Sequence, residues 1–191
     1  MTPTTLRGPR VTLRPWTDDD LAPFAAMNAD PEVMRWFKAP LTREESDAMA
    51  SRIRQRIDAE GFGLWALQTP ELRFAGFVGL FPALSFELPF EGLVGTTPLE
   101  IGWRLARPAW GRGDATEAAQ LALDHARHAL RVRRVVSFTT LGNRKSQAVM
   151  QRIGLQRVGE FDHPNLPGHP LQRHVLFATP PGWPVDPEPA A

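Results

Sequence analysis

The feature of this sequence that most restricts its fold is a glycine-rich turn that joins an alternating segment to an alanine-rich one. Residues 99–105, Leu-Glu-Ile-Gly-Trp-Arg-Leu, largely alternate between apolar and polar side chains, which predicts a β-strand. Residues 115–130 are rich in alanine and leucine and predict a long helix. Between them lies Trp-Gly-Arg-Gly-Asp at 110–114, so we expect a strand to lead through a tight turn into the start of a helix.

Such a junction is suited to bind an anion. The first backbone N–H groups of a helix lack intrahelical acceptors, and the helix dipole makes that end partly positive. Gly111 and Gly113 open the backbone to close approach, and Arg107 and Arg112 add positive charge nearby. The dinucleotide-binding pattern needs a third small residue where this chain has Thr116, and no P-loop motif occurs. The prediction is a site for a diphosphate outside those two nucleotide folds.

The junction resembles the acyl-CoA loop of the GNAT acetyltransferase superfamily, whose pattern is Gln/Arg-x-x-Gly-x-Gly/Ala at the start of a long helix. Trp110 stands in the first position, Gly113 in the fourth and Ala115 in the sixth. The missing Gln/Arg is usual in the branch that resembles ribosomal-protein-alanine N-terminal acetyltransferases, where Glu-Ile-Gly-aromatic leads into Trp-Gly-x-Gly-x-Ala-Thr-Glu-Ala. Residues 100–103 and 110–118 match that pattern in register. The alternative is a glycine-rich turn that only caps a helix.

The resemblance implies acetyl-CoA as co-substrate and no metal. It also covers a second motif, Asn143-x-x-Ser146-x-x-x-Met150, at the start of a later helix. Asn143 could equally be a helix N-cap. The residues implied for cofactor binding are Leu105, Ala106, Arg107, Trp110, Gly111, Arg112, Gly113, Asp114, Ala115, Thr116, Asn143, Ser146 and Met150.

Acetyl transfer to an amine needs a proton acceptor, a polarised thioester carbonyl and a proton for the departing thiolate. The resemblance implies Glu100 as general base, and backbone N–H groups at Leu105 or Ala106 as donors to the carbonyl. The chain contains no tyrosine, the usual acid of the family, so Ser146 is the implied general acid. Glu100 could instead be a solvated or arginine-paired strand residue, and Ser146 could serve only local capping.

Besides Glu100, five residues from three segments are candidates for binding the amine that accepts the acetyl group. The apolar segment 33–37 is as consistent with core packing as with a pocket wall. The insertion at 82–98 could be a lid, a dimer contact or an unanchored hairpin. The loop at 161–174 is rich in histidine and proline, yet its spacing fits no metal motif. The candidates are Trp36, Phe37, Phe90, His163 and His169.

Composition bounds the remaining classes. The 191 residues, 42% of them hydrophobic, predict one domain at 1–179 followed by a proline-rich tail at 180–191. A net charge of +1 gives no general attraction to nucleic acid or to a membrane. The absence of cysteine excludes disulfides and thiolate sites, and the absence of a signal pattern favours a cytoplasmic protein. The expected partners are acetyl-CoA and an amine, and we expect a monomer or homodimer. A non-catalytic CoA-binding regulatory module is the alternative, consistent with the missing tyrosine.

The expected fold is of the α+β class, α/β/α-like: the GNAT fold, with a mixed, mostly antiparallel sheet of six to seven strands, a central splay and about four helices. Thr42 and Glu45 form a capping box that predicts a helix ending at Gly61. Gly76 and Gly79 within a strand predict a bulge or a close backbone approach. Strands are expected near 10–16, 62–67, 74–81, 99–105, 134–139, 156–161 and 171–178, with helices at 17–30, 43–59, 115–130 and 144–153.

Overall fold

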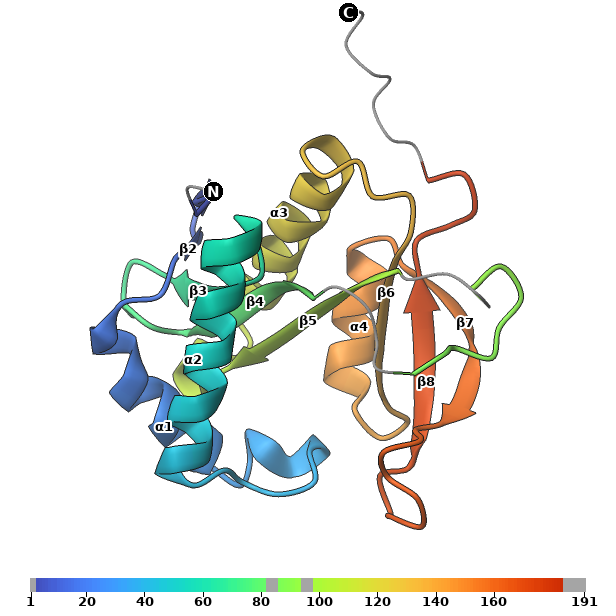
Figure 1. Ribbon diagram of the computed structural model, residues 1–191, viewed down its shortest axis with the longest axis horizontal. Coiled ribbons are helices and arrows are strands. Elements are labelled where there is room, and N and C mark those ends of the chain that lie inside the picture. The colour runs from blue at the N-terminus through green and yellow to red at the C-terminus, as the bar shows by residue number, and fades with distance from the viewer. Residues whose placement is uncertain (1–2, 82–85, 94–97, 184–191) are drawn as a thin grey trace, which may run out of the picture. The chain divides into compact units, whose positions relative to one another are not determined.

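The computed structural model describes residues 3–81, 86–93 and 98–183. It divides into two compact units (Figure 1). Unit 1 comprises Met1–Leu80 and Gly102–Leu121, and unit 2 comprises Phe81–Ile101 and Ala122–Ala191. Strand β5 (Leu99–Leu105) begins in unit 2 and ends in unit 1, whereas helix α3 (Asp114–His128) begins in unit 1 and ends in unit 2. The single domain expected at 1–179 stays a prediction.

Unit 1 contains β1 (Leu6–Arg7), β2 (Thr12–Arg14), β3 (Leu64–Gln68) and most of β4 (Gly76–Phe81), each antiparallel to the next, together with the end of β5 and the start of α3. Helices α1 (Leu21–Ala29) and α2 (Arg43–Glu60) contact each other, and an aromatic group that includes Trp16 and Phe24, with ring centroids 4.9 Å apart, forms part of the core. Unit 1 also contains the 3-10 helices η1 (Asp18–Asp20) and η2 (Met34–Trp36), and the last residue of β4 belongs to unit 2.

Local sequence signals explain the boundaries in unit 1. The capping box is formed, because Glu45 N–H donates to Thr42 Oγ1 at 3.2 Å and Thr42 N–H donates to Glu45 Oε2 at 2.8 Å. Helix α2 ends at Gly61 in a left-handed conformation, as predicted. The close approach predicted at the strand glycines is also confirmed, since a Cβ on Gly79 would lie 1.9 Å from the Gly63 carbonyl oxygen.

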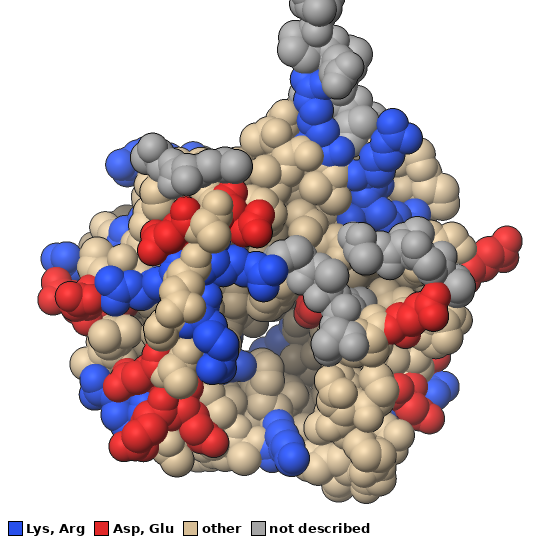
Figure 2. Space-filling view, in the orientation of Figure 1, with Lys and Arg blue, Asp and Glu red and all other residues tan. Residues whose placement is uncertain are grey.

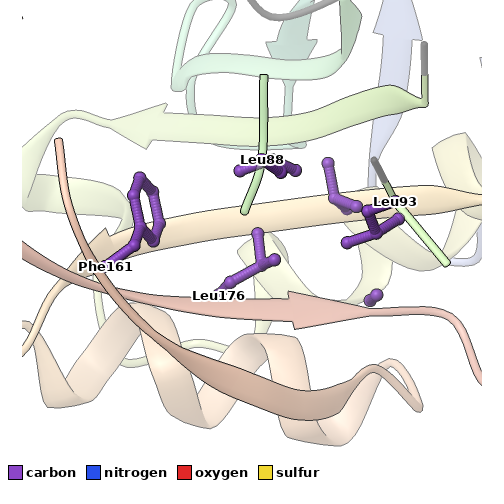
Figure 3. Close-up of a cluster of buried hydrophobic side chains, with 6 residues drawn as sticks. Leu88, Leu93, Phe161 and Leu176 are labelled. Atoms are coloured by element: carbon purple, nitrogen blue, oxygen red, sulfur yellow. The ribbon is translucent and has the colours of Figure 1, made fainter. Parts of the chain in front are cut away.

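Unit 2 contains β6 (Val135–Thr140), α4 (Arg144–Arg152), β7 (Gln156–Asp162) and β8 (Arg173–Ala178). The first residues of β5 pair in parallel with β6, and β6, β8 and β7 follow in antiparallel order. Two leucines from the 82–98 insertion, Leu88 and Leu93, are buried against these strands with Phe161 and Leu176 (Figure 3). The described part of that insertion is therefore anchored in a hydrophobic core, whereas residues 82–85 and 94–97 lie outside the described residues.

The structure confirms the predicted fold class and differs in the strand count. Among the described residues, eight strands follow the order β1-β2-β3-β4-β5-β6-β8-β7, and the β5–β6 pair is parallel in an otherwise largely antiparallel arrangement. The strand that the prediction of six to seven missed is β1, which has two residues and is too short to leave an alternating pattern. The described ranges contain four α-helices, which matches the expected number. The central splay stays a prediction, and residues 184–191 of the expected tail lie outside the described residues.

Candidate functional site

The chain between β5 and α3 forms an open turn at the start of α3, within unit 1. A short 3-10 helix, η3 (Arg107–Ala109), follows β5. Gly111 and Gly113 then adopt left-handed backbone conformations with φ of 77° and 85°. The Gly113 carbonyl accepts hydrogen bonds from the N–H groups of Thr116 at 3.0 Å and Glu117 at 3.1 Å, so α3 starts from Gly113. Because a left-handed φ strains residues with a Cβ, the turn depends on both glycines.

Five consecutive backbone N–H groups, from Gly111 to Ala115, have no hydrogen-bond acceptor among the residues that the structure describes. The turn is exposed from Gly111 to Gly113, and a Cβ on Gly111 would meet no atom within 4 Å. Free N–H groups at a helix start, together with the helix dipole, attract anions. This geometry supports the expectation that a diphosphate binds here.

Both arginines expected to add positive charge to this turn are paired with carboxylates. Arg107 Nε lies 2.7 Å from Asp30 Oδ2, and Arg112 Nη1 lies 3.4 Å from Glu71 Oε2. The pairing reduces the positive charge that each offers to a bound anion. Arg10, which the sequence analysis did not single out, donates from Nη1 to the Arg112 carbonyl at 2.7 Å and so braces the turn.

Glu117 ties the first turn of α3 to the start of β2. Its Oε1 accepts the backbone N–H groups of Arg10 at 2.8 Å and Val11 at 3.1 Å, and its Oε2 accepts Arg10 Nε at 2.8 Å. Burial alone would raise the pKa of this carboxyl, but these hydrogen bonds outweigh burial and lower the pKa. Glu117, the glutamate of the sequence motif, therefore has a structural role: it fixes the start of α3 against the segment that leads into β2.

The end of β5 supplies fewer free donors than the sequence suggested. Trp110 Nε1 donates to the Leu105 carbonyl at 2.8 Å, which folds the turn back onto the strand. The Ala106 N–H donates to the Ala75 carbonyl at 2.9 Å, so it is not free to polarise a thioester carbonyl. Of the two donors expected here, only Leu105 is left as a candidate.

Glu100 lies in the part of β5 that belongs to unit 2. Some of its surface is accessible, yet its carboxyl is enclosed, and burial raises the pKa of this carboxyl from 4.5 to about 8. No hydrogen bond or ion pair to the carboxylate is found within the described residues, so the arginine-paired alternative is not observed. A carboxyl with this pKa accepts a proton most effectively near neutral pH, as a general base should.

Asn143 and Ser146 meet at the start of α4, also in unit 2. Asn143 Oδ1 accepts the Ser146 N–H at 3.3 Å, and its Nδ2 donates to Thr139 Oγ1 at 2.9 Å, so the N-cap interpretation of Asn143 is confirmed. The Ser146 hydroxyl makes no hydrogen bond within the described part of the chain. Met150 is only 1% exposed, which favours core packing over direct contact with a cofactor.

The acceptor candidates of unit 1 lie beside a residue that the sequence analysis missed. Trp36 is half-buried, whereas Phe37 is 41% exposed and covers the guanidinium of Arg104 at 4.0 Å. Arg104 is buried, and burial lowers its pKa to about 10. The alternation of residues 99–105 offered a signal, because it assigned Arg104 to the same strand face as Glu100.

The acceptor candidates of unit 2 take part in its packing. A Cβ on Gly159 would lie 2.5 Å from Phe90 Cε1, so this glycine makes room for the phenylalanine ring. The rings of His163 and His174 lie 4.9 Å apart, and burial lowers the pKa of both. His169 accepts a backbone N–H within its own loop. Over the described ranges, no group of three or more potential ligand side chains could hold a metal ion.

Two further features concern charge and hydropathy. On the face drawn in Figure 2, Lys and Arg side chains are interspersed with Asp and Glu side chains, in line with the net charge of +1. Among the described helices, none is both long and apolar enough to cross a bilayer.

Comparison with known proteins was made on the sequence and on the fold. The chain is 27% identical over 148 residues to the uncharacterised protein YkkB of Bacillus subtilis. The aligned region covers 76% of this chain and 81% of YkkB. Its fold is similar to that of a ribosomal-protein-S5-alanine acetyltransferase from Vibrio fischeri, with a TM-score of 0.74, 16% identity and coverage of 96% and 100% of the two chains. It is also similar to Mycobacterium smegmatis RimJ in complex with CoA-disulfide, with a TM-score of 0.68, 20% identity and coverage of 93% and 89%.

The mixed sheet is similar to that of solved acetyltransferase structures. A family model of the GNAT acetyltransferase domain matches residues 10–156. The chain therefore belongs to the GNAT acetyltransferase family, and the resemblance inferred from the turn at 110–118 is confirmed.

Proposed function

We propose that this protein transfers the acetyl group of acetyl-CoA to a primary amine by direct attack, with Glu100 as general base and Ser146 as general acid. The observation that carries the proposal is the row of five N–H groups, from Gly111 to Ala115 at the start of α3, that have no acceptor in the described part of the chain. Such a row suits the diphosphate of coenzyme A, because it offers donors and the positive end of a helix dipole to the same anion. Membership in the GNAT acetyltransferase family supports acetyl-CoA as the acetyl donor.

The proposed reaction balances without a covalent intermediate. The amine nitrogen attacks the thioester carbonyl carbon, the carbon–sulfur bond breaks, and the proton lost by the nitrogen passes to the Glu100 carboxylate. The departing thiolate takes a proton from the Ser146 hydroxyl, which is free of other hydrogen bonds within the described residues. Water then returns a proton to the Ser146 oxygen and takes the proton from Glu100, so both residues regain their starting states. Proton transfer at both ends of the reacting bond is general acid–base catalysis.

The pKa of Glu100 supports an α-amine as the acceptor. Its value of about 8 is close to that of an α-ammonium group, which is about 7.7 to 8.0. A proton therefore moves between the two groups with little free-energy cost. The ammonium group of a lysine, with a pKa of about 10.4, would hold its proton more strongly. Protein N-termini and small α-amines are the acceptors that this match favours.

The test of the cofactor site is Gly113→Glu, with Gly154→Glu as its matched control. Both glycines have a left-handed φ, 85° and 83°, so the two variants carry similar backbone strain and the same added charge. The Cβ on residue 113 would lie 3.3 Å from Arg10 Nη2, the mobile end of a side chain that can shift, and the Cβ on residue 154 meets nothing within 4 Å.

The Kd for acetyl-CoA, measured by calorimetric titration, should be more than a hundredfold higher for Gly113→Glu than for Gly154→Glu. A carboxylate about 5 Å from a phosphate costs about 3 kcal/mol at an effective dielectric constant of about 20. We expect weak binding for Gly113→Glu and wild-type binding for Gly154→Glu. Unchanged acetyl-CoA affinity in Gly113→Glu would refute the assignment of the turn.

Thiol release with a panel of amines then separates the enzyme from a non-catalytic CoA-binding module. The enzyme releases coenzyme A only when a suitable amine is present, and mass spectrometry finds the acetylated amine. Tight acetyl-CoA binding without any acetylated product, also after incubation with cell extract, would favour the module.

A further inference from the structure

Arg104 is a buried cation in unit 1, and its guanidinium contacts two aromatic rings and one amide oxygen. The residue is 9% exposed, and its Nη1 donates to Asn28 Oδ1 at 2.6 Å. The ring of Phe37 lies 4.0 Å from the guanidinium carbon and that of Phe77 lies 5.4 Å from it, both within the range of cation–π attraction. Two aromatic rings and one amide oxygen thus hold the guanidinium in a fixed position.

The amide that meets Arg104 is itself held in one orientation. Asn28 and Ser46 are fully buried, and Asn28 Nδ2 donates to Ser46 Oγ at 2.9 Å. Because a guanidinium can only donate, the amide oxygen must face Arg104 and the amide nitrogen must face Ser46. The backbone carbonyl of Asn28 accepts a hydrogen bond from the Leu41 N–H at 2.9 Å, which fixes the end of α1. Several buried groups therefore serve to aim one arginine.

Among the described residues, none supplies a negative charge to the guanidinium of Arg104. Within the described residues, Arg104 forms no ion pair, and its buried Nε has no hydrogen-bond partner. The contrast within the same unit is Arg14, whose Nη1 and Nη2 each donate to a carboxylate oxygen of Asp20 at 2.8 Å. A buried cation without a counter-ion, and a buried donor without an acceptor, are both costly to the folded state. Since the Asn28 amide holds this unpaired guanidinium in a fixed orientation, we expect a ligand to supply the missing anion.

We propose that Arg104 binds a carboxylate of the acceptor, so that the acceptor is a small amine that also carries a carboxylate, such as a free amino acid. This inference rests on the proposed acetyltransferase function. The edge formed by Nε and Nη2 is the one that Asn28 does not use, and a guanidinium edge matches the two oxygens of a carboxylate. The exposed ring of Phe37 provides an apolar surface next to it for the rest of the molecule.

The test compares each acid with its own amide as acceptor. The probes are leucine and leucinamide, phenylalanine and phenylalaninamide, and γ-aminobutyrate and its amide, each assayed by thiol release at saturating acetyl-CoA. We expect at least one acid to exceed its amide tenfold or more in kcat/KM, mainly through a lower KM. The amines of α-amino acid amides are less basic than those of the acids, so a larger fraction of them is unprotonated and able to attack at neutral pH. A preference for the acids therefore requires a binding contact.

Two variants should abolish that preference by different routes. Arg104→Gln removes the charge, and Asn28→Asp puts a carboxylate within the protein at the position that now lies 2.6 Å from Nη1. In Asn28→Asp the arginine stays in place but is neutralised internally, so this variant tests the proposal even if Arg104→Gln folds poorly. In both, the ratio of acid to amide should fall to about one while the KM for acetyl-CoA is unchanged. Arg43→Gln, which removes an exposed arginine paired with Asp47 on α2, is the control and should keep the wild-type ratio.

The possible outcomes separate this inference from the proposed function. If the amides are acetylated as well as the acids, or better, the carboxylate anchor is wrong and the acetyltransferase function stands. If no probe is acetylated, direct titration of the same acids into the protein decides the anchor: binding that Asn28→Asp weakens at least tenfold supports it, and no binding overturns it. A purely structural Arg104 would lower the melting temperature when replaced and leave the acid-to-amide ratio unchanged.

Discussion

The raised pKa of Glu100 predicts that Glu100→Gln makes the protein more stable at neutral and alkaline pH. An enclosed carboxyl without a hydrogen-bond partner in the described structure prefers its neutral form. The glutamine side chain has nearly the same shape and never becomes charged. Replacing the glutamate therefore removes the cost of holding a carboxylate in an enclosed position. If Glu100 were a structural residue with a charged partner, the same substitution would destabilise the fold.

The size and the pH range follow from the shift of the Glu100 pKa from 4.5 to about 8. Below pH 4.5 the carboxyl is neutral in both the folded and unfolded chain, so it does not affect stability. Between pH 4.5 and 8 the unfolded chain loses the proton first, so the wild-type protein becomes less stable as the pH rises; above pH 8 the difference is constant. The full difference is about 3 to 5 kcal/mol, the lower value allowing for screening by the water that still reaches the side chain.

Urea denaturation followed by tryptophan fluorescence, at intervals from pH 4.5 to 9, measures this difference. We expect the free energy of unfolding of Glu100→Gln minus that of the wild type to be near zero at pH 4.5 and to reach its plateau near pH 8. Glu160→Gln is the control, since it removes a partly exposed carboxylate paired with Arg157 and Arg173 and should change stability by about 1 kcal/mol or less. A difference that does not depend on pH, or a Glu100→Gln protein that is less stable at pH 9, would refute the reasoning.

Three further predictions concern single residues. If Glu100 is the base, the ratio of wild-type to Glu100→Gln kcat/KM for one amine should grow about tenfold from pH 7 to pH 9, because the ionised fraction of a carboxyl with a pKa of about 8 rises about tenfold; a ratio that is flat with pH contradicts this role. Asn143→Asp keeps the oxygen that caps α4 and should unfold near the wild-type temperature, whereas Asn143→Ala should lose about 1 kcal/mol of stability; equal melting temperatures for the two variants would show that the cap is unimportant. Gly79→Ala would bring a Cβ to 1.9 Å from the Gly63 carbonyl oxygen and should cost about 3 kcal/mol, which thermal unfolding measures; a change below about 0.5 kcal/mol would mean that β3 and β4 separate easily.

Some groups that the sequence assigned to ligand binding have partners far away in the chain. Arg107 and Arg112 were expected to serve an anion, yet each is paired with a carboxylate from another segment, Asp30 or Glu71. The Ala106 N–H was a candidate donor to the thioester, and the Ala75 carbonyl accepts it. No spacing within a single segment encodes such long-range pairs.

The sequence by itself determined the features that arise within a few residues. The capping box of Thr42 and Glu45, the end of α2 at Gly61 and the glycine turn before α3 are all set by local backbone conformation and local hydrogen bonds. A motif of this kind survives in any surroundings that leave it exposed, so it could be recognised before the structure was known.

Only the tertiary structure decided the electrostatics of the candidate site. Glu100 and Arg104 are two polar residues of one alternating segment. The sequence indicates neither that burial raises the pKa of Glu100 nor that Arg104 has no counter-ion among the described residues. Both properties depend on which atoms from distant segments exclude water or supply charge around a side chain. The sequence specifies those neighbours only through the complete fold, because the cost of burying a charge is set by everything that surrounds it.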